Sequence, residues 1–127
     1  MPFVRISVPD KLSNNDLQQI ADAVHESLVA TFEVPVKDRF QVVTKHAAHE
    51  LIYAPEYLGI QHSDPVAFIQ ITCNDGRSVG MKKALFARLA AAIAAGGVIA
   101  PANVIVNLVE VKKENWSFGD GVAQYAP

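Results

Sequence analysis

The order of hydrophobic and polar positions along the chain divides it into two similar halves. In the first half, Phe3–Val8 is a short β-rich run, and Ser13 can cap a helix that follows it. Apolar residues then recur at helical spacing and predict one buried helix face: Leu17, Ile20, Ala21, Val24, Leu28 and Phe32. Pro35 closes this helix, and Arg39–His46 alternates apolar and polar residues as a second strand does.

The second half repeats this order. Val66–Cys73 predicts a strand, and Ser78 caps a predicted helix that runs through Ala95 and ends at Gly96-Gly97. Val104–Val109 predicts the last strand. Each half is therefore a β-α-β unit, whose crossover helix makes its two strands parallel.

These units predict an α+β fold (an α/β sandwich) in one domain, residues 1–127. Two duplicated β-α-β units, approximately residues 2–47 and 65–111, would form a four-stranded mixed sheet with both helices on one face. Residues 112–127 are expected to form a C-terminal hairpin or tail, with its turn at Asp120-Gly121. The strands of the second unit are continuous apolar runs, so their helix-free face needs a cover. Self-association into a closed ring is the first explanation.

Composition and charge exclude several classes of protein. The chain has 127 residues, 50% of them hydrophobic, which is enough for a core of its own. The net charge of −2 comes from interspersed charges with no basic stripe, which argues against nucleic acid as a partner. The most apolar run, Leu89–Ala100, is shorter than the roughly 20 residues that a membrane span needs. A single cysteine, Cys73, and a start unlike a signal peptide predict a cytoplasmic protein.

Pro2 is the first candidate for chemistry. If Met1 is removed, Pro2 exposes a secondary amine, and free α-amino groups titrate near neutral pH, at about 7.7–8.0. Asp38, just before the second strand, is expected at the same end of the sheet. If the two units run antiparallel, Arg77 at the start of the second helix arrives there too and can bind a carboxylate. The alternative is that Pro2 begins a strand, Asp38 belongs to a turn and Arg77 is a solvated charge.

The chain resembles the tautomerase superfamily, and within it most closely the malonate semialdehyde decarboxylase family. The resemblance runs from Pro2 to Tyr125. It rests on Pro2 behind Met1, on the segment Val34-Pro35-Val36-Lys37-Asp38-Arg39-Phe40-Gln41, and on Asn115-Trp116-Ser117-Phe118-Gly119.

The resemblance implies a role for each matching residue. Pro2 corresponds to the catalytic amino-terminal proline. Asp38 corresponds to an acid that positions substrate or water and supports the charged amine. Arg77 corresponds to an arginine that binds the substrate carboxylate or polarises its carbonyl. Trp116, Phe118 and Tyr125 correspond to a hydrophobic wall. The implied assembly is a homotrimer.

One position departs from the family pattern. The best-known decarboxylases have Arg-Pro-Arg at the turn where this chain has Asp75-Gly76-Arg77, so Asp75 replaces the first arginine. An anion there would favour the protonated amine, so we expect Pro2 to be cationic at pH 7. A cationic proline favours a lyase over an isomerase.

The expected activity is decarboxylation of a small 3-oxo acid such as malonate semialdehyde, without metal or organic cofactor. One alternative is a keto–enol tautomerase or hydratase of 2-oxo acids that uses Pro2 as a base. Another is a non-catalytic trimeric binding protein with a decayed site.

His46 and His49 have a spacing that could hold a metal, but no third ligand is evident. Cys73 is expected to be a packed thiol, because no base is indicated beside it.

Overall fold

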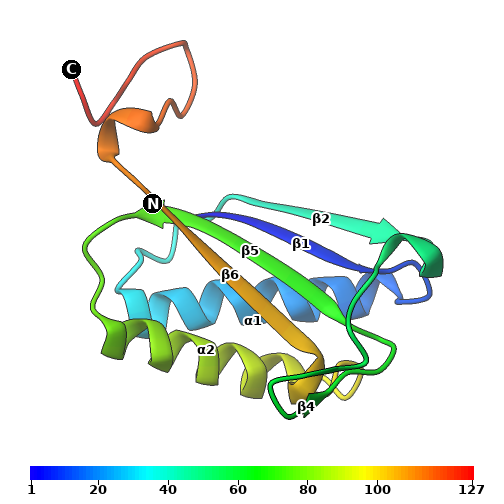
Figure 1. Ribbon diagram of the computed structural model, residues 1–127. Coiled ribbons are helices and arrows are strands. Elements are labelled where there is room, and N and C mark those ends of the chain that lie inside the picture. The colour runs from blue at the N-terminus through cyan, green and yellow to red at the C-terminus, as the bar shows by residue number, and fades with distance from the viewer.

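The computed structural model describes residues 1–127 as a four-stranded sheet covered on one face by two α-helices (Figure 1). The main elements in chain order are β1 (Phe3–Pro9), α1 (Asn14–Phe32), β2 (Gln41–His46), β5 (Ala67–Asn74), α2 (Val79–Ala94) and β6 (Val104–Val111). The strand order is β2-β1-β5-β6. β1 and β2 are parallel, β5 and β6 are parallel, and the two pairs meet antiparallel at β1 and β5. The predicted fold of two β-α-β units is confirmed.

The core lies between the sheet and the helices. Alternate residues of β1, among them Ile6, and of β5, among them Ile71, are fully buried against α1 and α2. α1 begins where the sequence predicts, because the Ser13 hydroxyl accepts from the Asp16 amide at 3.1 Å and the Asp16 carboxylate accepts from the Ser13 amide at 2.9 Å. No helix of the chain has the length and apolar character needed to cross a bilayer.

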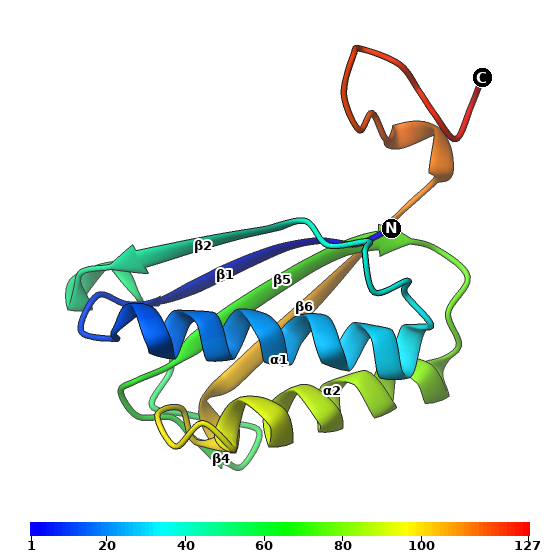
Figure 2. The same ribbon diagram turned by 180° about the vertical axis from the view of Figure 1, so that it is seen from behind.

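The other face of the sheet has no helix over it (Figure 2). The sequence predicted an apolar surface here, and the structure shows a mixed one. Phe68 and Ile105 are half-buried on this face, whereas Gln70 and Asn107 are exposed and hydrogen-bonded to each other at 3.3 Å. The apolar runs of β5 and β6 are therefore interrupted on the open side by one polar pair.

Several short elements were not predicted. β3 (Glu56–Tyr57) and β4 (Ile60–Gln61) form a separate two-stranded ladder. Single turns of 3₁₀ helix occur as η1 (Ala48–Glu50), η2 (Pro101–Asn103) and η3 (Lys113–Asn115). Elements of two or three residues have no periodicity for a sequence pattern to reveal.

Of the two forms predicted for residues 112–127, a hairpin or a tail, the structure has the tail. Asp120 and Gly121 do form a turn, with φ of 56° and 68°, but no strand flanks it. The side chain of Gln124 replaces a strand partner: its Oε1 accepts from the Phe118 amide at 2.9 Å and its Nε2 donates to the Gly119 carbonyl at 3.2 Å. The C-terminal segment, defined here as residues 112–127, thus folds on itself and projects from the body (Figures 1 and 2).

Candidate active site

Three parts of the chain meet at one end of the sheet: the N terminus, the end of β5 and the C-terminal segment (Figure 1). The antiparallel register pairs Phe3 with Thr72, which brings the residues before Phe3 beside the end of β5. The Val4 amide donates to the Phe40 carbonyl at 3.0 Å, which holds the segment before β2 against the N terminus as well. The sheet topology therefore assembles this site from both units.

The chain's amino group senses two opposite charges at this end. Burial lowers the pKa of the Met1 amine, Asp38 raises this pKa and Arg77 lowers it. With smaller effects, Cys73 also raises this pKa and Lys113 also lowers it. Asp38 and Arg77, predicted to converge near the start of the chain, are thus the charged groups that act most strongly on its amine.

Asp38 carries a buried oxygen with no partner. It ends a tight turn in which its amide donates to the Pro35 carbonyl at 2.9 Å. Its Oδ1 is buried and makes no hydrogen bond. Because a buried carboxylate oxygen without a partner is costly, this atom is a candidate acceptor for an amine, a water or a substrate group.

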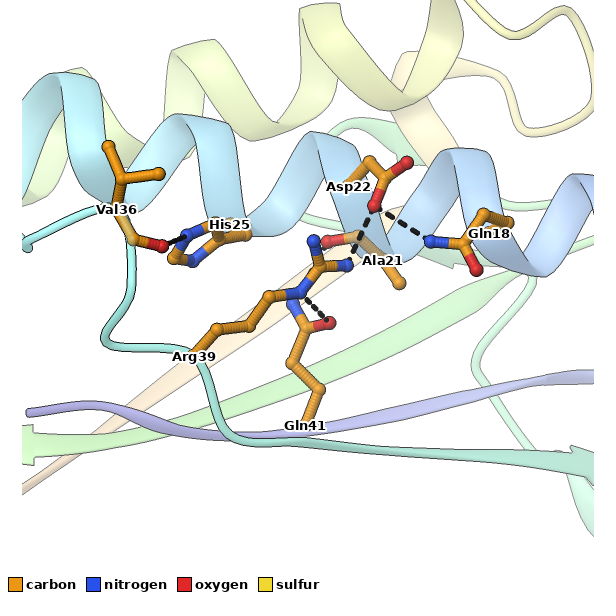
Figure 3. Close-up of polar contacts among 7 residues, drawn as sticks. All are labelled: Gln18, Ala21, Asp22, His25, Val36, Arg39 and Gln41. Carbon is orange, nitrogen blue, oxygen red and sulfur yellow. Dashed lines mark hydrogen bonds and ion pairs between the residues drawn. The ribbon is translucent and has the colours of Figure 1, made fainter.

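A hydrogen-bond network joins α1 to residues 36–41, the segment that contains Asp38 and the start of β2 (Figure 3). Arg39 donates to Asp22 at 2.7 Å, and Gln41 donates to the Ala21 carbonyl at 2.9 Å. Two residues before Asp38 in the sequence, the Val36 carbonyl is hydrogen-bonded to the ring of His25 at 2.7 Å. The hydrogen bond from Arg39 holds the pKa of Asp22 below its ordinary value, so this ion pair persists at neutral pH.

Arg77 is fixed by its own chain. Its Nη1 donates to the Asn74 carbonyl at 3.1 Å and its Nη2 to the Phe32 carbonyl at 3.4 Å, and its guanidinium lies 5.0 Å from the centre of the Phe32 ring. A guanidinium has five N–H donors, so donors remain for a ligand. The half-buried Arg77 can bind a carboxylate without losing these contacts.

An aromatic pocket of about 230 Å³ lies beside Pro2. Its lining comprises Met1, Pro2, Phe3, Phe40, Trp116, Ser117 and Phe118. Trp116 and Phe118 are stacked with ring centres 5.5 Å apart, and Tyr125 packs edge-on against Phe118 at 5.2 Å. The pocket can hold a small substrate and exclude water from one side of it.

The structure brings together most of the residues singled out in the sequence. Pro2, Trp116 and Phe118 line the pocket, and Tyr125 supports it from outside the lining. Asp75 is exposed and forms no side-chain hydrogen bond or ion pair; its amide donates to the Val111 carbonyl at 3.0 Å. Asp75 therefore shapes the turn through its backbone.

Two residues of this region were not singled out in the sequence. Phe40 lines the pocket. It belongs to the segment Val34–Gln41, which carries the family resemblance, and this was the signal that could have identified it. Asn74 accepts hydrogen bonds from both Arg77 and Trp116, and a polar residue at a strand end gives no signal of this.

No group of three His, Cys, Asp or Glu side chains is placed to hold a metal ion. Burial raises the pKa of the Cys73 thiol, which makes it a poor nucleophile.

Comparison with known proteins gives the family. Two family models, both described as tautomerase enzyme, match residues 38–119 and 2–61. The chain is 33% identical to probable tautomerase YusQ of Bacillus subtilis (strain 168), over 98% of each chain. It is 29% identical to probable tautomerase YrdN of the same organism, over 98% of this chain and 96% of the relative.

Solved structures agree with this result. FG41 malonate semialdehyde decarboxylase inhibited by 3-bromopropiolate has a TM-score of 0.91 and 36% identity, over 97% of this chain and 93% of that one. Another malonate semialdehyde decarboxylase, described with decarboxylase and hydratase activities, has a TM-score of 0.88 and 29% identity, over 97% and 95%. A fused 4-OT, described as a symmetric trimer, shares the fold with a TM-score of 0.79 and 21% identity, over 98% of both chains. On the fold and these matches together, the chain belongs to the tautomerase enzyme family, near malonate semialdehyde decarboxylase.

Proposed function

We propose that this tautomerase-family enzyme, after removal of Met1, decarboxylates a small 3-oxo acid such as malonate semialdehyde, with Pro2 as the catalytic amine and no cofactor. The observation that carries the proposal is the convergence on the chain's amine of one acid, Asp38, and one cation, Arg77, beside an aromatic pocket. The similarity to two malonate semialdehyde decarboxylases supports the choice of substrate.

In the proposed mechanism the substrate carboxylate is bound by the free donors of Arg77. The Pro2 ammonium donates a hydrogen bond to the carbonyl oxygen at C3, and Asp38 keeps the amine protonated. The C1–C2 bond then breaks, CO₂ leaves, and the electron pair of that bond forms an enol. The hydroxyl proton of this enol comes from the Pro2 ammonium. The enol then takes up a proton from water at C2 and returns its hydroxyl proton to the Pro2 amine, which gives the aldehyde, acetaldehyde for malonate semialdehyde.

The aromatic pocket contributes by removing water. Trp116 and Phe118 present flat apolar surfaces beside Pro2, with the ring of Phe40 next to that of Phe118. A carboxylate held against such a surface loses hydration that the neutral product CO₂ does not need. This favours loss of CO₂ over simple binding of the acid.

The first experiment measures acetaldehyde formation from malonate semialdehyde by wild type and by Pro2→Ala, after mass spectrometry has shown that Met1 is absent. We expect turnover by wild type and its loss in Pro2→Ala. Correctly processed wild type without turnover would contradict the decarboxylase proposal. Met1 retained on the purified protein would favour the non-catalytic binding function instead, since it blocks the amine.

A keto–enol tautomerase is the second candidate, and one observation favours it. Burial lowers the pKa of the amine at this end of the sheet, and a neutral Pro2 would act as a base. Titration of ¹⁵N-labelled Pro2 by NMR separates the two candidates. A pKa above 7 fits the decarboxylase, and a pKa below 7 fits a tautomerase or hydratase of 2-oxo acids.

We also propose that the chain assembles as a homotrimer. A groove of about 760 Å³ runs beside the edge strand β6 and is lined mostly by apolar residues, among them Tyr57, Leu58 and Phe86, which are exposed in the single chain. The fused 4-OT structures of the same fold are described as trimers. Light scattering is expected to give three times the chain mass, and Leu58→Glu is expected to lower it; a monomeric wild type would contradict the proposal.

A further inference from the structure

Asn74 occupies a junction that the mechanism above does not use. It is the last residue of β5, directly before the Asp75-Gly76-Arg77 turn, and it is only 8% exposed. Its backbone carbonyl accepts from Arg77 Nη1 at 3.1 Å, and its side-chain Oδ1 accepts from Trp116 Nε1 at 2.7 Å. One buried residue therefore contacts both Arg77, the proposed carboxylate-binding cation, and Trp116, which belongs to the aromatic wall of the pocket formed by Trp116 and Phe118.

The hydrogen bond to Trp116 fixes the orientation of the Asn74 amide. An indole N–H can only donate, so the amide oxygen must face it and the amide nitrogen must point away. Its length of 2.7 Å is short for an N–H···O bond, and Asn74 is mostly shielded from water. An unpaired acceptor and an unpaired indole N–H at this place would both be costly.

This bond is also the polar attachment of the aromatic wall. The C-terminal segment projects from the body, and the bond between Trp116 and Asn74 is its one side-chain hydrogen bond to the rest of the chain. An aromatic contact adds to it, between Phe118 and Phe40, whose ring centres are 6.0 Å apart. Aromatic contacts tolerate sliding, whereas a hydrogen bond specifies direction and distance.

We propose that Asn74 is a positioning residue that sets Trp116 and Arg77 in one fixed relation, so that the carboxylate of the substrate is bound and desolvated at the same place. This inference rests on the proposed function and deepens it. A misplacement of the wall by about 1 Å can cost up to 100-fold in rate, even when every reacting group is still present.

The single tryptophan of the chain provides a direct readout. In Asn74→Ala we expect the emission of Trp116 to move to longer wavelength and acrylamide to quench it more strongly, because the indole N–H loses its buried acceptor and the ring becomes more exposed to water. We expect kcat/KM to fall about tenfold. The matched control is Asn15→Ala, at an exposed site on α1 away from this end of the sheet, which should leave emission and kcat/KM unchanged.

A double-mutant cycle tests the coupling. Trp116→Phe keeps an aromatic ring and removes the N–H, so it should lower kcat/KM to a similar extent. Asn74→Ala combined with Trp116→Phe should then cost no more than the larger single change, because both remove one bond. Additive losses would overturn the proposal, and so would unchanged emission and kinetics in Asn74→Ala. Should Asn74→Ala fail to fold, Asn74→Asp carries the test.

Asn74→Asp leaves both hydrogen bonds possible and adds a negative charge, because Arg77 contacts the backbone carbonyl of residue 74. The carboxylate still accepts from Trp116, so emission should match wild type. The added negative charge beside Arg77 should weaken binding of an anionic substrate, raising KM about tenfold while kcat changes less. Emission shifted as in Asn74→Ala, or a KM that stays at the wild-type value, would contradict the inference. The emission measurements need no turnover, so they test the hydrogen bond between Trp116 and Asn74 even if wild type releases no CO₂.

Discussion

Two similar turns, one in each half of the molecule, differ in whether the polar side chain at their end is hydrogen-bonded. The turn before β2 ends at Asp38, whose amide donates to the Pro35 carbonyl at 2.9 Å; the turn before β6 ends at Asn103, whose amide donates to the Ala100 carbonyl at 2.9 Å. The Asn103 side chain is satisfied, because it accepts from the Ser63 amide at 3.0 Å and donates to the Ser63 hydroxyl at 3.4 Å. The Asp38 Oδ1 is buried with no partner.

The difference follows from what precedes the first strand of each half. Ser63, which precedes β5, forms two hydrogen bonds with Asn103, whereas no residue before β1 forms a hydrogen bond with Asp38 Oδ1. A polar group that is satisfied at one turn stabilises the fold, and the unsatisfied group at the other turn is available for chemistry. Changes at the two turns should therefore affect different properties of the protein.

The largest expected effect is on activity at the first turn. Asp38→Asn should lower kcat/KM roughly 100-fold, because the charge that supports the protonated amine is lost. The free energy of unfolding should stay close to wild type, since no hydrogen bond to Oδ1 is broken. Steady-state kinetics and urea unfolding measure the two quantities. A large loss of stability with little loss of rate would reverse the contrast between the turns.

The matching change at the second turn is expected to act on stability. Asn103→Ala removes two hydrogen bonds of a side chain that is 3% exposed, which should lower the free energy of unfolding by about 1–3 kcal/mol. KM and kcat should stay within about twofold of wild type, because η2 is remote from the pocket beside Pro2. Chemical denaturation gives the stability. An activity loss without destabilisation would show that this turn, too, serves the reaction.

The pH dependence sharpens the contrast further. Asp38 raises the pKa of the amine at the start of the chain, so its removal should lower the pKa of Pro2 by about one pH unit. The protonated form is then lost at lower pH, and activity that needs it declines earlier as the pH rises. ¹⁵N NMR titration of Pro2 measures the shift, with Asn103→Asp as the control. A pKa unchanged in Asp38→Asn would contradict the assignment of Asp38.

The smallest expected effect concerns the network that holds the first turn. The pKa of Asp22 is lowered in the folded protein by the hydrogen bond from Arg39, so its stabilisation is present above the ordinary value of 3.8 and disappears as the pH falls through the folded pKa. Both side chains are partly exposed, so Arg39→Gln should cost only a few tenths of a kcal/mol at pH 7. Thermal unfolding should show this difference at pH 7 and none near pH 2.

The fold was predictable because its long elements repeat a strong pattern. The strand predicted at Phe3–Val8 is observed at Phe3–Pro9, and the helix capped by Ser13 begins at Asn14. The C-terminal segment was not predictable, since the turn at Asp120-Gly121 is typical of a hairpin. The Gln124 side chain instead takes the hydrogen bonds that a strand would have made.

The candidate site was predictable only in part. Pro2, Asp38 and Arg77 could be placed near one another because strand direction alone decides which ends of the sheet meet. Asn74 could not, because its two contacts join residues 3 and 42 positions away along the chain. The role of Asp75 towards the substrate stays a prediction, since an exposed side chain at a turn looks the same in sequence as one that faces a ligand.

A chain built from two like halves still has only one amino terminus. Pro65 stands just before β5 as Pro2 stands just before β1, but its nitrogen is locked in a peptide bond with Asp64 and carries no proton. The two halves are antiparallel, so Pro65 lies at the far end of the sheet from Pro2. In the proposed mechanism each chain therefore supplies one secondary amine, and cleaving the chain between Asp64 and Pro65 would create another at the opposite end of the sheet.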